Sequence, residues 1–300
     1  MSARGRPVVE TPVVDLLVPR DHTSASGPGD GGAGKARIRA VIGTVVPPIV
    51  VATVVVAIWL VVSYEVLSPR QRFLLPPPQQ VIRVGFLDFH NLSEVLRGLW
   101  STTQVALVGL FIAIALGLVF AILMAQALWI ERSFYPYAVI LQTIPIIALV
   151  PLIGFWFKYD FRSRVIVCVL ISLFPIITNT LFGLHSVDRG LLDLFRLHGA
   201  GRVAALRKLQ LPAAMPAMFA GFRISAGLSV IGAIVGDFFF REGQPGIGRL
   251  IDVYRSQLAS ERLFTAIFFS SLLGLTVFWV FGFIGNRAIR SWHDSAREPE

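Results

Sequence analysis

The chain has 300 residues, of which 55% are hydrophobic and only 15% are charged, and its mean hydropathy is +0.70. A soluble domain carries about 25% charged residues, so this composition excludes an ordinary water-soluble protein and indicates that lipid is the solvent. The net charge of +9 could suit nucleic acid. The sequence shows no basic, aromatic-studded soluble module, however, so we expect no nucleic-acid partner and assign the excess of arginine to orientation and anionic lipid headgroups.

The first 40 residues differ from the rest because they are rich in proline and glycine. Such a segment buries too little apolar surface to offset its ordering entropy, so we predict a disordered tail over 1–40. Within it, residues 29–35 match the start of a phosphate-binding loop, but Ala36 stands where the motif needs Ser or Thr, and no strand precedes it. We therefore expect no nucleotide or other cofactor site there.

Six apolar segments then follow that are long enough to cross a bilayer, which takes ~20 residues of helix. They should be helices, because backbone polar groups in lipid must be satisfied within each segment. None shows the alternation of a barrel strand. The sequence therefore predicts an all-α membrane protein whose six transmembrane helices lie near 41–64, 102–128, 136–157, 165–184, 213–239 and 263–284.

Lysine and arginine indicate the orientation. With the N-terminus inside, the inner segments carry 15 of these cations and the outer loops 11, which is the positive-inside bias. Both termini are then cytoplasmic in a multi-pass protein of the cell membrane. Beyond the tail and the first helix, the expected organisation is an extracytoplasmic loop with a short amphipathic segment over 65–100, a core of five transmembrane helices over 101–290 that includes a cytoplasmic insert over 185–212, and a cytoplasmic C-terminal tail over 291–300.

The insert is a basic, helical island between two apolar runs. The sequence predicts a short helix from Leu191 to Leu197, a glycine break at 199–201, and a second short helix before Pro212, where a new span can begin. Such a pair could lie on the lipid headgroups as an amphipathic element, or it could dock into a soluble partner. The residue pattern alone leaves both interpretations open.

The spacing within the insert resembles a family signature. Gly199 is followed, after nine residues, by Leu209-Gln-Leu211-Pro212, and the cytoplasmic signature of ABC-importer permeases reads Glu-Ala-Ala, three residues, Gly, nine residues, Ile-x-Leu-Pro. Asp193 takes the Glu position, whereas Leu194 and Phe195 take the two Ala positions and so depart from the pattern. Stretches at 75–81, 142–152 and 211–223 also resemble this family, in particular its nitrate/sulfonate/taurine branch, which includes vitamin-precursor and riboflavin permeases.

This resemblance, over residues 70–290, implies the type I importer fold with a cytoplasmic coupling helix. It implies that two permease copies form the pore, that cytoplasmic ATP-binding subunits hydrolyse ATP, and that an extracytoplasmic solute-binding protein delivers a small solute. The chain itself would be a transport subunit and not an enzyme, with no catalytic, cofactor or metal residues. The residues that the resemblance assigns to ATPase coupling are Asp193, Leu194, Phe195, Gly199, Leu209, Leu211 and Pro212.

Several polar residues fall inside the predicted spans. The candidates for lining a translocation path are Gln142, Thr143, Asn179 and Arg223. Neutral polar groups in spans also serve as bonds between helices, and a charge such as Arg223 should face protein or water. We interpret Asp237 as a carboxylate at the membrane interface, with a loop-bracing pair to Arg241 or Arg249 as the alternative.

Prolines 145, 151 and 175 also lie within spans and predict bends. The competing functional class is a secondary transporter or channel without an ATPase, but such proteins often show a repeated half or several intramembrane charges, and this chain has no evident repeat. An intramembrane enzyme would need clustered catalytic residues, and the five histidines are scattered. The sequence predicts an ATP-driven importer permease and does not indicate its solute.

Overall fold

The computed structural model describes residues 31–240 and 242–289, with side chains from residue 46 onward. The chain divides into two compact units, residues 1–55 and residues 56–300. Helix α1 (Gly31–Val61) begins within the range 1–40 that we expected to be tail. The structure does not describe residues 1–30, which belong to the expected N-terminal tail, or residues 291–300, the expected C-terminal tail. Of the phosphate-loop-like stretch 29–35, it describes only the backbone of residues 31–35.

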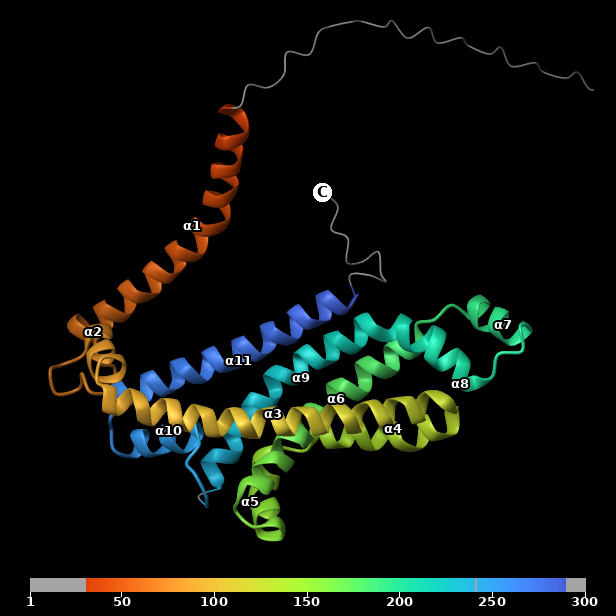
Figure 1. Cartoon of the computed structure of the whole chain (residues 1–300). Helices are drawn as coiled ribbons and strands as arrows, with labels where there is room; N and C mark the ends of the chain where they lie inside the picture. The colour runs from red at the N-terminus through yellow and green to blue at the C-terminus, as the bar shows by residue number, and fades with distance from the viewer. Residues whose placement is uncertain (1–30, 241, 290–300) are drawn as a thin grey trace, which may run out of the picture. The chain divides into compact units, whose positions relative to one another are not determined.

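Every regular element in the described ranges is helical (Figure 1). Within the described ranges, five helical stretches are long and apolar enough to cross a membrane, and a bent pair of helices makes six if the pair counts as one span. The five are Val46–Val66, α3 (Phe89–Gln126), α6 (Phe161–His185), the stretch Arg202–Phe239 and α11 (Ser260–Ile289). The all-α membrane fold expected from the apolar segments is therefore confirmed.

The expected third span, 136–157, is wrong as a single continuous helix. It is formed by α4 (Leu128–Thr143) and α5 (Ile146–Phe157), which bend by 100° at the break between them. Pro145 caps α5, and Ile144 before it is extended, with φ −69° and ψ 126°. A residue that precedes proline is pushed out of the helical region, so the break follows from the sequence at this point. Pro151 and Pro175, in contrast, remain inside α5 and α6.

The expected loop 65–100 is shorter than predicted, because α3 begins at Phe89. The side chain of Asp88 caps this helix by accepting hydrogen bonds from the backbone N–H groups of His90, at 2.9 Å, and Asn91, at 3.3 Å, an arrangement that stabilises a helix start. The rest of the loop holds the π-helical turn Val62–Val66, the short α2 (Pro78–Val81) and a second π-helical turn, Ile82–Phe86.

Helices α3, α6 and α9 (Leu211–Phe239) form the centre of the second unit, and α6 and α9 run side by side (Figure 1). Cys168 of α6 is fully buried between its two neighbours. A Cβ atom added to Gly232 of α9 would lie 2.9 Å from the Cα atom of Cys168, and one added to Gly109 of α3 would overlap the Cys168 side chain. Small residues thus allow close backbone approach, as is common in membrane helix pairs.

Candidate functional site: the helical insert and the opposite end of the bundle

The insert consists of α7 (Arg189–Leu197), α8 (Arg202–Ala205) and a π-helical turn, Leu206–Gln210, that continues into α9. The Asp188 side chain caps the start of α7 by accepting a hydrogen bond from the Gly190 N–H at 2.6 Å. Gly199, which follows the end of the helix by two residues, has a φ of +72°. The Gly199 N–H donates to the Arg196 carbonyl at 2.9 Å and the Ala200 N–H donates to the Phe195 carbonyl at 3.0 Å. These two bonds form a Schellman cap, which requires the left-handed residue that glycine supplies.

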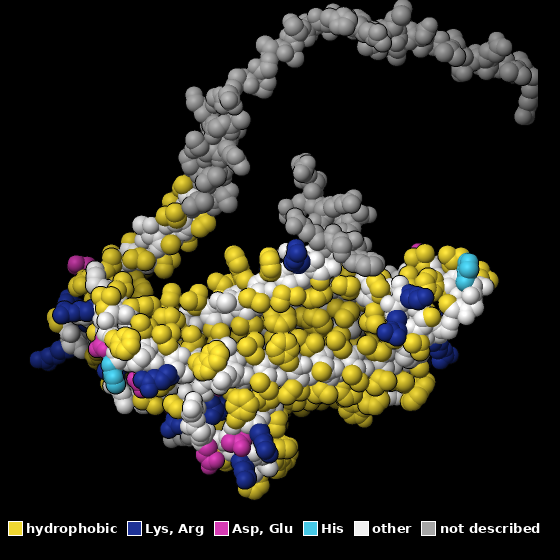
Figure 2. Space-filling model, in the orientation of Figure 1, with side chains coloured by type: hydrophobic (Ala, Val, Ile, Leu, Met, Phe, Trp, Pro, Cys, Tyr) yellow, Lys and Arg dark blue, Asp and Glu magenta, His cyan; other side chains and the backbone are white. Residues whose placement is uncertain are grey.

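One side of α7 exposes a row of leucines. Leu191 and Leu194 are each 47% exposed and Leu197 is 84% exposed, and their spacing of three residues places them on neighbouring positions of the helix surface. Apolar side chains gather over this end of the molecule beside Lys and Arg side chains (Figure 2). An exposed apolar row with a basic border is the kind of surface that binds a partner or a membrane.

The coupling residues predicted on α7 occupy different environments. Asp193 is exposed and forms an ion pair with Arg196, with 3.0 Å between Oδ1 and Nη1; such a surface pair is worth only ~0–1 kcal/mol and can rearrange for a partner. Leu194 is half exposed, whereas Phe195 is partly buried. Both border a hollow of about 340 Å³ between α7 and the following helix, lined by Leu194, Phe195, His198, Ala200, Ala204 and Lys208.

The second short helix that we expected to end before Pro212 is instead continuous with α9. The Leu211 N–H donates to the Leu206 carbonyl, five residues back, in a π-helical turn. Proline lacks an N–H and crowds the carbonyl four residues earlier, and such a widened turn accommodates an interruption without ending the helix. Leu209, Leu211 and Pro212 are partly buried and lie where the insert joins α9, apart from the exposed row on α7.

Three of the four residues predicted to line a translocation path contact neighbouring groups of the same chain. The Thr143 hydroxyl donates to the Ile140 carbonyl at 2.9 Å, and its neighbour Gln142 is exposed. The Asn179 side chain donates to the Pro175 carbonyl at 2.8 Å. The Arg223 guanidinium carbon lies 4.0 Å from the centre of the Phe278 ring of α11, which gives this cation the partner that the sequence did not reveal. Their role in a translocation path stays a prediction.

The interpretation of Asp237 as an interfacial carboxylate is wrong. Asp237 is fully buried, and its Oδ1 lies 3.1 Å from the Nη1 of Arg164, which is 3% exposed. Arg241 lies outside the described residues. Sequence reasoning missed Arg164 because it was counted among the cations of a loop. The available signal was that these opposite charges lie at the start of one span and the end of the next, positions that antiparallel neighbours bring to the same side of a membrane.

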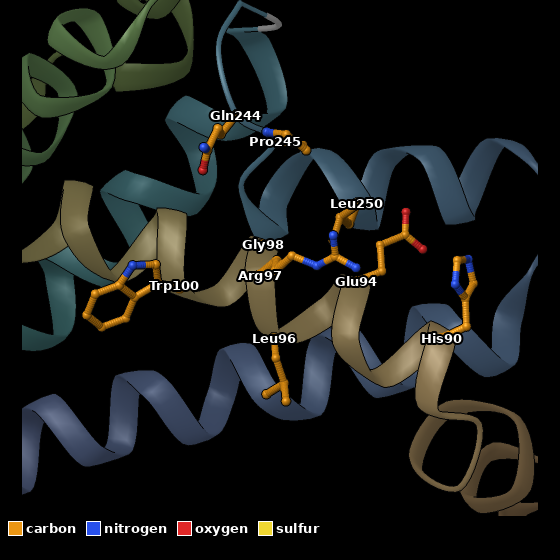
Figure 3. A pocket seen from close by; sticks show the side chains of 9 residues that line it. All are labelled: His90, Glu94, Leu96, Arg97, Gly98, Trp100, Gln244, Pro245 and Leu250. Atoms are coloured by element: carbon orange, nitrogen blue, oxygen red, sulfur yellow. The ribbon is translucent and has the colours of Figure 1, made fainter.

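A cavity of about 660 Å³ lies at this end of the bundle (Figure 3). It is lined by His90, Glu94, Leu96, Arg97, Gly98, Trp100, Gln244, Pro245 and Leu250. The side chains of Arg97 and Glu94 extend from α3 toward Leu250 of α10 (Ile247–Ser256). The Tyr254 hydroxyl donates to Oε2 of Glu94 at 2.9 Å. Burial, together with this carboxylate, raises the pKa of Tyr254 and keeps the phenol as a donor.

Known proteins resemble the chain over most of its length. It is similar to the formylaminopyrimidine transport permease protein ThiX of Halalkalibacterium halodurans, with 37% identity over 210 residues that cover 69% of this chain and 82% of the relative. It is also similar to the riboflavin transport system permease protein RibX of Chloroflexus aurantiacus, with 31% identity over 236 residues that cover 76% of this chain and 84% of that protein.

Solved structures support the same fold. A chain of the MetNI methionine ABC transporter, in an inward-facing conformation, matches with a TM-score of 0.54 and 18% identity, over 67% of this chain and 96% of that chain. The family model for the binding-protein-dependent transport system inner membrane component matches residues 113–290, which include the α4–α5 pair, the insert and the last three spans. The chain therefore belongs to this family, the inner-membrane permeases of binding-protein-dependent ABC importers.

Proposed function

We propose that α7 and its glycine cap are the element through which this permease is driven by a separate ATP-binding subunit. An importer of this family works with an ATPase and a binding protein, so the permease must receive mechanical work from outside the membrane. The observation that carries the proposal is the row of exposed leucines on α7, which ends in a fixed Schellman cap. A short helix with no buried residue of its own gains stability when a partner covers that row.

The base of the insert is suited to transmit a displacement. Gly183, near the end of α6, packs against Ala214, near the start of α9: a Cβ atom added to Gly183 would lie 3.0 Å from the Ala214 Cα. Helices that touch this closely move together, because a packed interface resists compression. A shift of α7 would therefore reach α6 and α9 at once. The partly buried Leu209, Leu211 and Pro212 would act as the anchor of the insert, and Asp193 and Leu194 as its contact surface.

The orientation and the assembly are parts of the same proposal. We place the insert and both termini in the cytoplasm, which the distribution of lysine and arginine supports. We also propose a pore formed by two copies of this chain. Gln142, Thr143 and Arg223 are exposed on the single chain, and polar groups at membrane depth are stable only against protein or water. A second copy would enclose them beside a water-filled path.

For the solute we propose a nitrogen heterocycle of the pyrimidine-precursor or riboflavin class. The relatives that carry such a solute in their names share 37% and 31% identity with this chain, whereas two nitrate permeases share 28%. An aliphatic sulfonate is the competing solute, because a permease named for it shares 31%. Uptake of labelled formylaminopyrimidine, riboflavin and taurine by cells expressing the whole importer would separate these classes. Uptake of taurine alone would contradict the heterocycle assignment.

The coupling proposal is tested by the double variant Leu194→Asp with Leu197→Asp. Both side chains are exposed, so the permease should fold and insert, but a docking contact would bury two unpaired carboxylates at a penalty of several kcal/mol. We expect loss of the ATP-binding subunit on mild detergent extraction and loss of uptake. Leu87→Asp is the matched control, because Leu87 is 75% exposed near the start of α3 and should retain both. A double variant that keeps its ATPase and imports at the parent rate would refute the proposal.

A further inference from the structure

The buried ion pair between Arg164 and Asp237 does more than join α6 to α9. Two charges inside a membrane bundle carry a large desolvation penalty, which is offset only when further hydrogen bonds satisfy their remaining donors and acceptors. Both side chains are at most 3% exposed, so the groups that complete this pair must come from the protein.

Most of those groups belong to one short segment of backbone, residues 242–248. Arg164 donates from Nη2 to the Glu242 carbonyl at 2.9 Å and from Nη1 to the Gln244 carbonyl at 3.2 Å. Gly248 packs against the same acidic residue, since a Cβ atom added to Gly248 would lie 2.8 Å from the Asp237 Cβ. A guanidinium suits this task because it is a planar fork of donors that can serve a carboxylate and two carbonyls together.

Thr102 of α3 connects the same segment to the carboxylate. Its hydroxyl donates to Oδ2 of Asp237 at 2.5 Å and accepts a hydrogen bond from the Ile247 N–H at 2.8 Å. The segment also lies directly on the carboxylate, since a Cβ atom added to Gly246 would overlap the Asp237 side chain. Three helices and one loop thus meet at a single buried charge pair.

Segment 242–248 forms part of the wall of the cavity of about 660 Å³. Gln244 and Pro245 line that cavity together with residues of α3 (Figure 3). The backbone carbonyl of Gln244 also accepts the hydrogen bond from Arg164. The hydrogen bond from Tyr254 to Glu94 holds α10 against α3 at a second point. A change in the arrangement of α6 and α9 would therefore displace this wall of the cavity.

We infer that Arg164 is a positioning residue that, through Asp237 and Thr102, fixes segment 242–248 and makes the wall of the cavity opposite the insert move as one body with α6, α9 and α3. This role goes beyond the proposed coupling through α7, because it concerns the other end of the same two helices. It gives the far end of the permease a defined response when α6 and α9 shift.

The variant Arg164→Lys separates this role from simple charge neutralisation. Lysine preserves the positive charge beside Asp237, but its single ammonium group cannot reproduce the planar fork that reaches both carbonyls. We expect the importer to assemble with its ATPase, while amide exchange in residues 242–250 and labelling of a cysteine placed at Gln244 rise about tenfold, the effect of losing roughly one net hydrogen bond of stability. Uptake should fall in parallel. Exchange and labelling at the parent rates would overturn the inference.

A second variant keeps the test decisive if Arg164→Lys fails to insert. Thr102→Val is close in shape and leaves the ion pair intact, but it removes the acceptor for the Ile247 N–H. Exchange of the Ile247 amide should rise about tenfold in this variant, and an unchanged rate would show that Thr102 does not hold segment 242–248. Recovery of the ATP-binding subunit is read separately. We expect the α7 variants to lose this subunit, whereas Arg164→Lys and Thr102→Val should keep it. The coupling proposal fails if the α7 variants keep the subunit, and the present inference fails if exchange in residues 242–250 is unchanged.

Discussion

Replacing Gly199 by serine should unfold the end of α7 and uncouple the importer. Gly199 has a φ of +72°, and an added Cβ atom would meet nothing within 4 Å. Steric collision with the rest of the chain therefore contributes nothing, and the whole effect comes from placing an L-residue in the left-handed region, which costs roughly 1–2 kcal/mol. The helix is short, at nine residues, with none buried, so this loss falls on an element with little stability in reserve.

The conformational penalty at the cap determines how often α7 opens. A change of about 1–2 kcal/mol raises the open fraction of α7 roughly 5–30-fold. Gly201→Ser is the matched control, because Gly201 also has open space around an added Cβ atom but has a φ of −68° at the start of α8, where serine is a favourable capping residue. Gly199→Asn should recover most of the loss, since asparagine tolerates the left-handed conformation.

The assay is hydrogen exchange of the Gly199 and Ala200 amides, which bond to the carbonyls of Arg196 and Phe195, measured beside recovery of the ATP-binding subunit. We expect faster exchange and lower recovery for Gly199→Ser, and parent behaviour for Gly201→Ser. Amide exchange at the parent rate in Gly199→Ser would show that the left-handed cap does not hold the end of the insert helix in place. If Gly199→Asn restores the protected amides but not the partner, the docking site requires a bare backbone at this position.

Three further predictions concern other parts of the chain. In intact cells an impermeant thiol reagent should label Gln244→Cys but not Val203→Cys, and labelling at Val203 would reverse the proposed orientation. Gly232→Ala should destabilise the bundle by ~1–3 kcal/mol through overpacking against Cys168, measured as the loss of folded protein in a thermal series. Gly227→Ala on the same helix, where an added Cβ atom has open space, should be neutral or stabilising, and equal effects would contradict the packing argument. Tyr254→Phe removes the hydrogen bond to Glu94 and should lower stability by about 1 kcal/mol; an unchanged thermal series would show that this bond does not hold α10.

Most of the span pattern could be predicted because it depends on local composition. An apolar run of ~20 residues has one stable form in lipid, and the glycine break at 199–201 marks the end of α7 without help from the rest of the chain. The Schellman cap at Gly199 is such a local feature, since its hydrogen bonds reach back no more than five residues.

The breaks at prolines were only partly predictable. Pro145, Pro151 and Pro175 give the same local signal, yet only the chain at Pro145 turns by 100°, while the other two stay within helices. A proline inside a membrane helix is tolerated when neighbouring groups satisfy the freed carbonyls, and those neighbours are known only from the fold. Pro212 shows the reverse error, because a π-helical turn carries the helix through a position where a new start was expected.

The buried ion pair could not be found from local patterns. Arg164 and Asp237 are 73 positions apart in the sequence, and each taken alone is a charge near the end of an apolar run, which is usually an interfacial residue. Their pairing depends on α6 and α9 lying side by side, and the role of the glycines at 246 and 248 depends on the carboxylate beneath them.

The most direct test of the central claim is a photo-crosslinker placed at Leu197, the most exposed leucine on α7, in the assembled importer. We expect light to attach this residue to the ATP-binding subunit, and we expect the yield to change when ATP is added, because the contact carries the mechanical work. A crosslinker at Leu87 should not capture that subunit. Products at Leu197 that contain only lipid would contradict the account and identify the insert as a membrane-surface helix.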